Sequence, residues 1–221
     1  MNARLYPLFF LICLHCLLSP SLAQESDSKN EEKLSRSTGG EFFSVSNNQG
    51  NDARIIQIQD QNKAYILQQG QNQLQVNQNG FSNFASLNQS GNQNQILVDQ
   101  YGANNETTIW TLGQNIRINS NQIGDENLIR AFLNNQGDNP QTALLNQYGN
   151  QNRIDIASVS AAGALRESGR VQVNQQGDGN VFSASLDPFG SPISVTQTSG
   201  VGGQGMRLHI STNAFPWTGI K

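Results

Sequence analysis

The chain has 221 residues, enough for one or two ordinary domains, but its composition is not that of an ordinary globular domain. Asn and Gln make up roughly a quarter of it, whereas the hydrophobic and charged fractions, 36% and 13%, are both low. The formal net charge is −3 and no basic block occurs, which argues against a nucleic-acid partner.

Residues 1–23 have the parts of a secretory signal peptide. Arg4 gives a positive start, an apolar run covers residues 8–18, and Ala23 ends a cleavage motif of small residues. The apolar run is too short for a membrane-spanning helix. Cleavage would also remove both cysteines, so we expect a secreted chain without disulfides.

Residues 24–41 are rich in Ser, Glu and Lys and almost free of apolar side chains. Such a segment cannot bury enough apolar surface to fold alone, so we predict a disordered polar leader. A recognition tail for an export pore or a surface anchor is the alternative.

Residues 42–186 carry an 11-residue repeat, which is typical of stacked repeat architectures. In its best form the repeat reads Asn83-x-Ala85-x-Leu87-x-Gln89, with polar residues between. The linking phrase Gln-x-Gly-x-x-Asn occurs six times, beginning at Gln78, Gln89, Gln100, Gln122, Gln147 and Gln175.

The alternation predicts β-strands, because residues at even offsets project from one face of a strand. Each repeat then forms one strand and one turn, with Gly supplying the positive φ of the turn. Two repeats make a coil of about 22 residues, and stacked coils form an all-β solenoid of two sheets. Its open strand edges favour further stacking and amyloid-like cross-β assembly.

The inward Gln and Asn side chains of successive coils are expected to form hydrogen-bonded amide ladders that support assembly. The predicted ladder positions are Gln57, Asn62, Gln68, Gln78, Asn83, Gln89, Asn94, Gln100, Asn105, Gln122, Asn127, Gln147, Asn152, Gln175 and Asn180. The predicted turn glycines are Gly70, Gly80, Gly91, Gly102, Gly113, Gly124, Gly137, Gly149 and Gly177.

The repeat weakens towards the C-terminus. Residues 158–170 are interpreted as an insertion or a lost repeat. The prolines and glycines of residues 187–221 predict an irregular tail or cap, to which Trp217 would be an anchor.

The phrase from Gln78 to Gln89, with Gly80, Asn83 and Ala85 in place, resembles the curlin repeat of bacterial curli fibres, and the resemblance covers about residues 51–186. It implies a subunit exported through an outer-membrane pore. Such subunits assemble, with surface assembly factors, into extracellular amyloid fibres of themselves and other curlin-like subunits, for adhesion and biofilm formation. Large aliphatics in place of Ala, two insertions and scattered charges favour a minor or nucleating subunit over a major one.

Two other classes of function remain open: a monomeric solenoid adhesin that binds glycan or ice, and a β-helix enzyme acting on polysaccharide. His209 lacks a neighbouring Cys or acidic motif and is expected at the surface. Asp125 and Glu126 follow a turn glycine and are expected to be solvated, with a metal or acid–base pair as the alternative. Trp110 and Phe132 are predicted to stack on the outer surface. We predict no catalytic residue, cofactor or metal.

Overall fold

The structure, a computed structural model, describes residues 41–46, 50–160, 169–186, 192–200 and 203–211. The predicted signal peptide, nearly all of the predicted leader and Trp217 lie outside these residues. The described part of the chain contains no helix with the length and apolarity needed to cross a membrane. Its strands are β1 (Glu41–Ser46), β2 (Asp52–Ile58), β3 (Lys63–Asn79), β4 (Phe84–Tyr101), β5 (Glu106–Gln114), β6 (Ile116–Ile123), β7 (Leu128–Asn135), β8 (Gln141–Tyr148), β9 (Arg153–Ser160), β10 (Gly169–Gln176), β11 (Val181–Leu186), β12 (Ile193–Thr198) and β13 (Arg207–Ser211).

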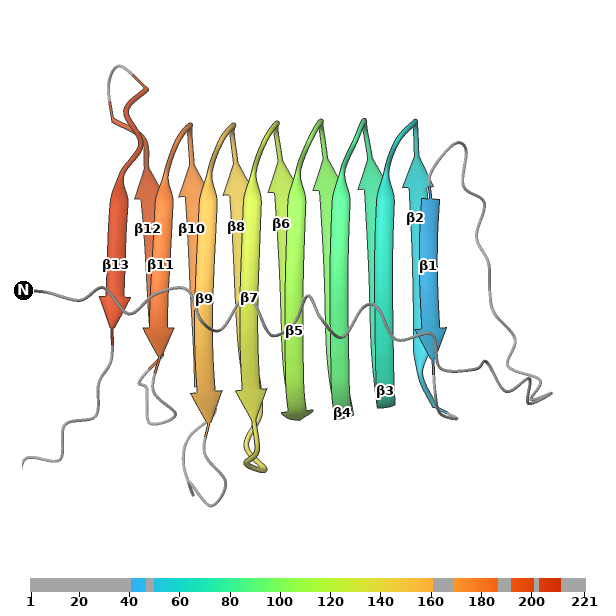
Figure 1. Cartoon of the computed structure of the whole chain (residues 1–221). Coiled ribbons are helices and arrows are strands. Elements are labelled where there is room, and N and C mark those ends of the chain that lie inside the picture. Colours follow the sequence, from blue (N-terminus) through green and yellow to red (C-terminus); the bar gives the residue numbers. More distant parts are fainter. Residues whose placement is uncertain (1–40, 47–49, 161–168, 187–191, 201–202, 212–221) are drawn as a thin grey trace, which may run out of the picture. The chain divides into compact units, whose positions relative to one another are not determined.

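The coils of a solenoid follow one another in sequence order, and each strand pairs in parallel with the equivalent strand of the next coil, as β5 does with β7 and β6 with β8 (Figure 1). Residues 22 positions apart lie in neighbouring coils, as Asn83 and Asn105 do. We call the two walls layer one and layer two. Layer one contains β1, the first halves of β3 and β4, β5, β7, β9, β11 and β13, and layer two contains β2, the second halves of β3 and β4, β6, β8, β10 and β12. The predicted all-β solenoid with coils of about 22 residues is thus confirmed.

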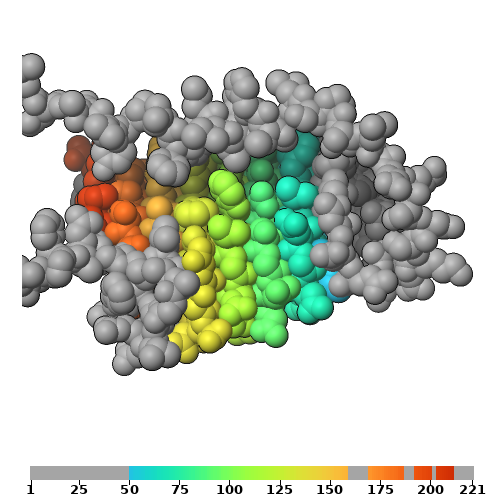
Figure 2. All heavy atoms as spheres, turned by 60° about the horizontal axis from the view of Figure 1, so that its bottom comes forward, coloured from blue at the N-terminus to red at the C-terminus, as the bar shows by residue number. Residues whose placement is uncertain are grey.

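Side chains alternate between the space enclosed by the layers and the surface. In the first half of β4, Ala85, Leu87 and Gln89 are buried while the residues between them face outward. The buried aliphatic side chains form a continuous core from Ala64 to Leu186. One coil buries only a few aliphatic groups, so each coil depends on its neighbours for stability. Figure 2 shows the coils as successive bands along the chain.

Two corners connect the layers in every regular coil. Corner one leads from layer two to layer one, as at residues 79–83, and corner two leads back, as at residues 91–94. Both begin with a glycine of positive φ, 130° at Gly80 and 120° at Gly91, and both place a second positive-φ residue before the asparagine. A Cβ on Gly91 would collide with the carbonyl oxygen of Gly113 in the next coil, so only glycine fits.

The solenoid continues past residue 186, where we expected an irregular tail. Strand β12 extends layer two on β10, and β13 extends layer one on β11. Pro192 precedes β12, so it removes no hydrogen-bond donor from that strand.

Insertions lengthen the later coils without breaking the stack. The spacing between neighbouring asparagines rises from 22 residues to 25 at Asn152 and 28 at Asn180. One predicted turn glycine is wrong: Asn135, and not Gly137, stands opposite Gly113. Residues 136 and 137 fall in the longer loop that precedes β8. The extra residues of this coil move Gly137 out of the position that pairs with Gly113.

Candidate assembly ladders

Seven glutamines of layer two stack into one continuous column, which we call the long ladder. Each Nε2 donates to the Oε1 of the glutamine in the next coil, at N···O distances of 2.7–3.0 Å. Their side chains are at most 2% exposed. The column consists of Gln57, Gln78, Gln100, Gln122, Gln147, Gln175 and Gln197.

The long ladder also ties the two layers together within each coil. Gln100 donates from Nε2 to the carbonyl oxygen of Phe84, at 3.1 Å, which begins the layer-one strand of the same coil. The equivalent bond, to the carbonyl oxygen of the first residue of the layer-one strand, is 3.0–3.1 Å long and is donated by Gln78, Gln122, Gln147, Gln175 and Gln197. From Gln78 to Gln197 these amides are therefore buried with both Nε2 and Oε1 hydrogen-bonded, which avoids the cost of an unpaired buried polar group.

A second column, the Asn ladder, follows corner one at the start of the layer-one strands. Each Oδ1 accepts the backbone N–H of the next asparagine at 3.0–3.1 Å and its Nδ2–H at 3.0–3.2 Å. Nδ2 of Asn105 also donates to the carbonyl oxygen of Gly124, at 2.7 Å, so the asparagine and the turn glycine are linked. The ladder consists of Asn62, Asn83, Asn105, Asn127, Asn152 and Asn180.

The corresponding column in layer one, the short ladder, ends after two glutamines. Gln68 donates to Gln89 at 2.8 Å. On the next layer-one strands the equivalent position is occupied by Thr111, Leu133, Ser158 and Leu186. The Oγ1 of Thr111 is buried with no hydrogen-bond partner. At corner two the asparagines similarly stop at Asn94, which is followed by Ile116. The weakening of the repeat is therefore confined to one side of the solenoid.

All fifteen predicted amide positions are buried, and the structure sorts them into these columns. Sequence reasoning omitted Gln197, because the residues after 186 were assigned to a tail, although Ile193-x-Val195-x-Gln197 repeats the alternation. It also omitted Asn72, whose spacing is disturbed by a one-residue deletion at corner two.

Comparison with protein-family models matches the curlin associated repeat twice, at residues 71–102 and 82–110. Residues 71–110 are therefore curlin repeats. Comparisons with curated proteins and with solved structures find no match. The matched residues include Gln78 and Gln100 of the long ladder and Gln89 of the short ladder, and they end immediately before Thr111, the first residue to replace a glutamine.

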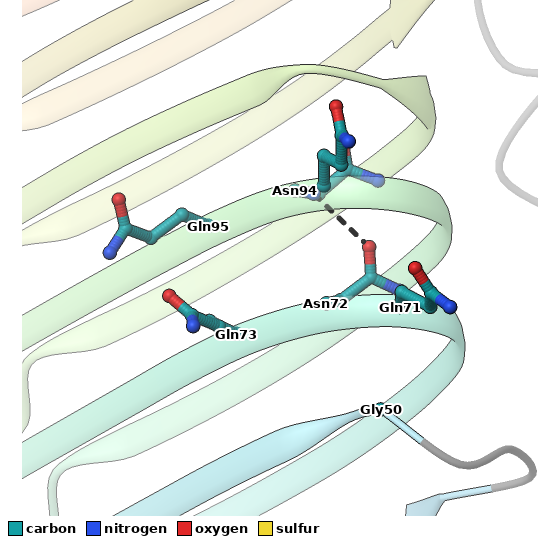
Figure 3. Close-up of a pocket in the computed structure, with 7 residues that line it drawn as sticks. Gly50, Gln71, Asn72, Gln73, Asn94 and Gln95 are labelled. Carbon is teal, nitrogen blue, oxygen red and sulfur yellow. Dashed lines mark hydrogen bonds between the residues drawn. The ribbon is translucent and has the colours of Figure 1, made fainter.

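The deletion at corner two produces the hollow shown in Figure 3. Gln71 is the single residue between Gly70 and Asn72, where the next coil has two, and Asn94 donates its N–H to Asn72 Oδ1 at 3.3 Å. The lining consists of Gly50, Gln71, Asn72, Gln73, Gln93, Asn94 and Gln95. None of these side chains is an acid, a base or a nucleophile, so the hollow offers no catalytic group.

The outer surface carries the remaining candidate residues. The rings of Trp110 and Phe132 lie 5.3 Å apart in an edge-to-face arrangement on adjacent strands. Asp125 Oδ1 accepts the N–H of Ala103 at 2.8 Å, and Glu126 Oε2 accepts from the side chain of Gln151 at 2.9 Å, so both acids bond to neighbouring coils.

His209 Nδ1 lies 2.7 Å from Ser183 Oγ in the adjacent strand. The next residue in this row is Asp155, but the serine stands between it and the histidine. The carboxylate is instead paired with Arg153, so it does not orient the imidazole as a catalytic triad requires. Within the described ranges no three acidic, His or Cys side chains gather as they would around a metal ion.

Proposed function

We propose that the chain is a secreted structural subunit of a curli-type amyloid fibre at the bacterial surface. The long ladder carries this proposal, because it repeats the same buried amide contact in every coil and runs to β12 at the C-terminal end. Columns of identical buried amides of this kind stabilise the stacked strands of cross-β fibres. The subunit is a building element without catalytic activity, and the fibre serves adhesion and the biofilm matrix.

The function is tested by assembly of the secreted chain, residues 24–221. Purified chain should form sedimentable fibres that bind thioflavin T after a lag, and fragments of those fibres should abolish the lag. A chain that stays monomeric under seeded conditions overturns the proposal. Mass spectrometry of exported protein should give an N-terminus at Gln24, as the predicted signal peptide requires.

We further propose that the subunit nucleates fibres or joins them as a minor component. The truncated short ladder supports this role, since Thr111 and Leu133 interrupt a column that a regular repeat would continue. Longer coils near Asn152 and Asn180 support it too. Substoichiometric amounts of the chain should shorten the lag of a major curlin subunit. An unchanged lag contradicts the nucleating role. Export would use an outer-membrane pore and surface assembly factors, which deletion of the pore would test.

A further inference from the structure

The two layers contain different numbers of strands. Among the described residues, layer one stacks eight strand segments, from β1 to β13, and layer two stacks seven, from β2 to β12. The N-terminal end presents β1 and β2, which belong to one coil. The C-terminal end presents β12 and then β13, which lies one strand further along the axis. The described solenoid therefore ends half a coil out of phase with its beginning.

This phase difference matters when a second copy is added at the C-terminal end. If that copy has the same orientation, β13 meets β1 of the next copy in layer one. Strand β12 and β2 of the next copy then lie about 9–10 Å apart, which is twice the spacing of neighbouring strands. Gln197 and Gln57 of the next copy could not hydrogen-bond directly over that distance.

Rotation of the next copy by a half-turn about the solenoid axis removes this mismatch. Strand β1 of the next copy then lies against β12, and β2 lies against β13, each at one strand spacing. The internal geometry permits this exchange, because corners one and two share the same pattern of positive φ values: 130° and 56° at Gly80 and Ser82, and 120° and 58° at Gly91 and Gln93. One strand and one corner thus correspond to a half-turn throughout the regular coils.

The residues at the two ends also match under this rotation. In the shared register Leu208 and Ile210 of β13 occupy inward rows, as Ala53 and Ile55 of β2 do. Apolar residues would therefore meet apolar residues inside the junction. On the outside, the exposed Arg207 would face the exposed Asp52 of the next copy, a favourable cross-strand pair of opposite charges.

We propose that consecutive subunits in the fibre are related by a half-turn, so that the C-terminal β12–β13 edge of one copy receives the β1–β2 edge of the next. The partner surface is therefore a second copy of this chain in a defined orientation. This inference rests on the proposed function, since it concerns the junctions of the fibre. It makes the fibre one continuous solenoid in which layer one of one subunit follows layer two of the previous subunit.

Engineered disulfides test the orientation. His209 and Arg54 are exposed at equivalent strand positions, and the half-turn places them in adjacent parallel strands at a Cα separation that a disulfide spans. Fibres of the His209→Cys/Arg54→Cys chain, oxidised with copper–phenanthroline, should give a series of covalent multimers on a non-reducing gel. The matched His209→Cys/Phe43→Cys chain, which reports the unrotated junction, should stay monomeric on the same gel.

The outcomes separate this inference from the proposed function. If fibres form and the second pair cross-links, or neither pair does, the half-turn is wrong while the fibre function stands. Should either cysteine pair prevent fibre formation, the Arg207→Cys/Asp52→Cys chain tests the same β13–β2 junction. Its cysteines lie two residues earlier on the same two strands. If no chain assembles, including the unmodified one, the proposed function itself fails.

Discussion

Replacing Gln100 by alanine tests the energetic weight of the long ladder. The substitution removes the bond accepted from Gln78 at 2.8 Å, the bond donated to Gln122 at 2.8 Å and the bond to the carbonyl oxygen of Phe84 at 3.1 Å. Each bond contributes about 0.5–1.5 kcal/mol, and the partners left behind remain buried. All three bonds lie within one subunit, so they contribute to subunit addition when the chain folds as it joins the fibre. For such coupled folding we expect a loss of about 2–4 kcal/mol in the free energy of adding a subunit.

The assay is the critical concentration, the monomer concentration left in equilibrium with fibres. A loss of about 2–4 kcal/mol raises it roughly 30- to 700-fold, since 1.4 kcal/mol is a factor of ten. Gln95→Ala is the matched control on the same strand: Gln95 is exposed and accepts one bond, from Arg117 Nε at 3.1 Å. It should change the critical concentration by about twofold or less.

Equal effects of Gln100→Ala and Gln95→Ala would refute the reasoning, because they would show that the buried amide column adds nothing beyond ordinary strand pairing. A Gln100→Glu variant adds a further check. It places a carboxylate in a fully buried row, and it should assemble less readily than the alanine variant at neutral pH. Comparable assembly of the two variants would show that the row is open to solvent.

Three further predictions concern the turns, the interrupted column and the outer surface. Gly91→Ala should destabilise assembly by about 1–3 kcal/mol or more, because the backbone has a φ of 120° and the added methyl group would meet the next coil. The control is Gly200→Ala, where a Cβ would have no atom nearby. It should leave the critical concentration unchanged. Thr111→Gln should extend the short ladder beyond Gln89 and lower the critical concentration roughly fivefold, a gain of about 1 kcal/mol. Thr108→Gln, whose side chain faces outward, is the control. If both variants have the same critical concentration, the ladder geometry is contradicted. A double-mutant cycle between Trp110→Ala and Phe132→Ala should give a coupling of about 0.5–1.5 kcal/mol in guanidinium dissociation of fibres, and additive effects would mean that the rings do not interact.

The sequence was sufficient to predict the strands, the coil length and the buried amides, because the period of two and the recurring glycine both have direct geometric meanings. Gln78, Asn83 and Gln89 illustrate this: their even offsets placed them on one face, and all three are buried. Fold and inward positions follow from local spacing alone.

The division of the amides into two unequal columns could not be predicted in the same way. The phrase beginning at Gln89 looks like its neighbours in the sequence, but it spans corner two, whereas the phrases beginning at Gln78 and Gln100 span corner one. Only the pairing of alternate repeats shows that the losses at Thr111 and Ile116 fall on one side. The extent of the C-terminal strands was missed for a related reason, since proline content is a poor guide where proline precedes the strand it was expected to disrupt.

X-ray fibre diffraction from aligned, assembled chain tests the central claim most directly. Coils that continue from one molecule to the next should give a sharp meridional reflection at about 4.7–4.8 Å and an equatorial reflection near about 10 Å, from the strand and layer spacings. A chain that sediments as a monomer and yields no oriented 4.7–4.8 Å reflection under seeded conditions would contradict assembly through the solenoid ends.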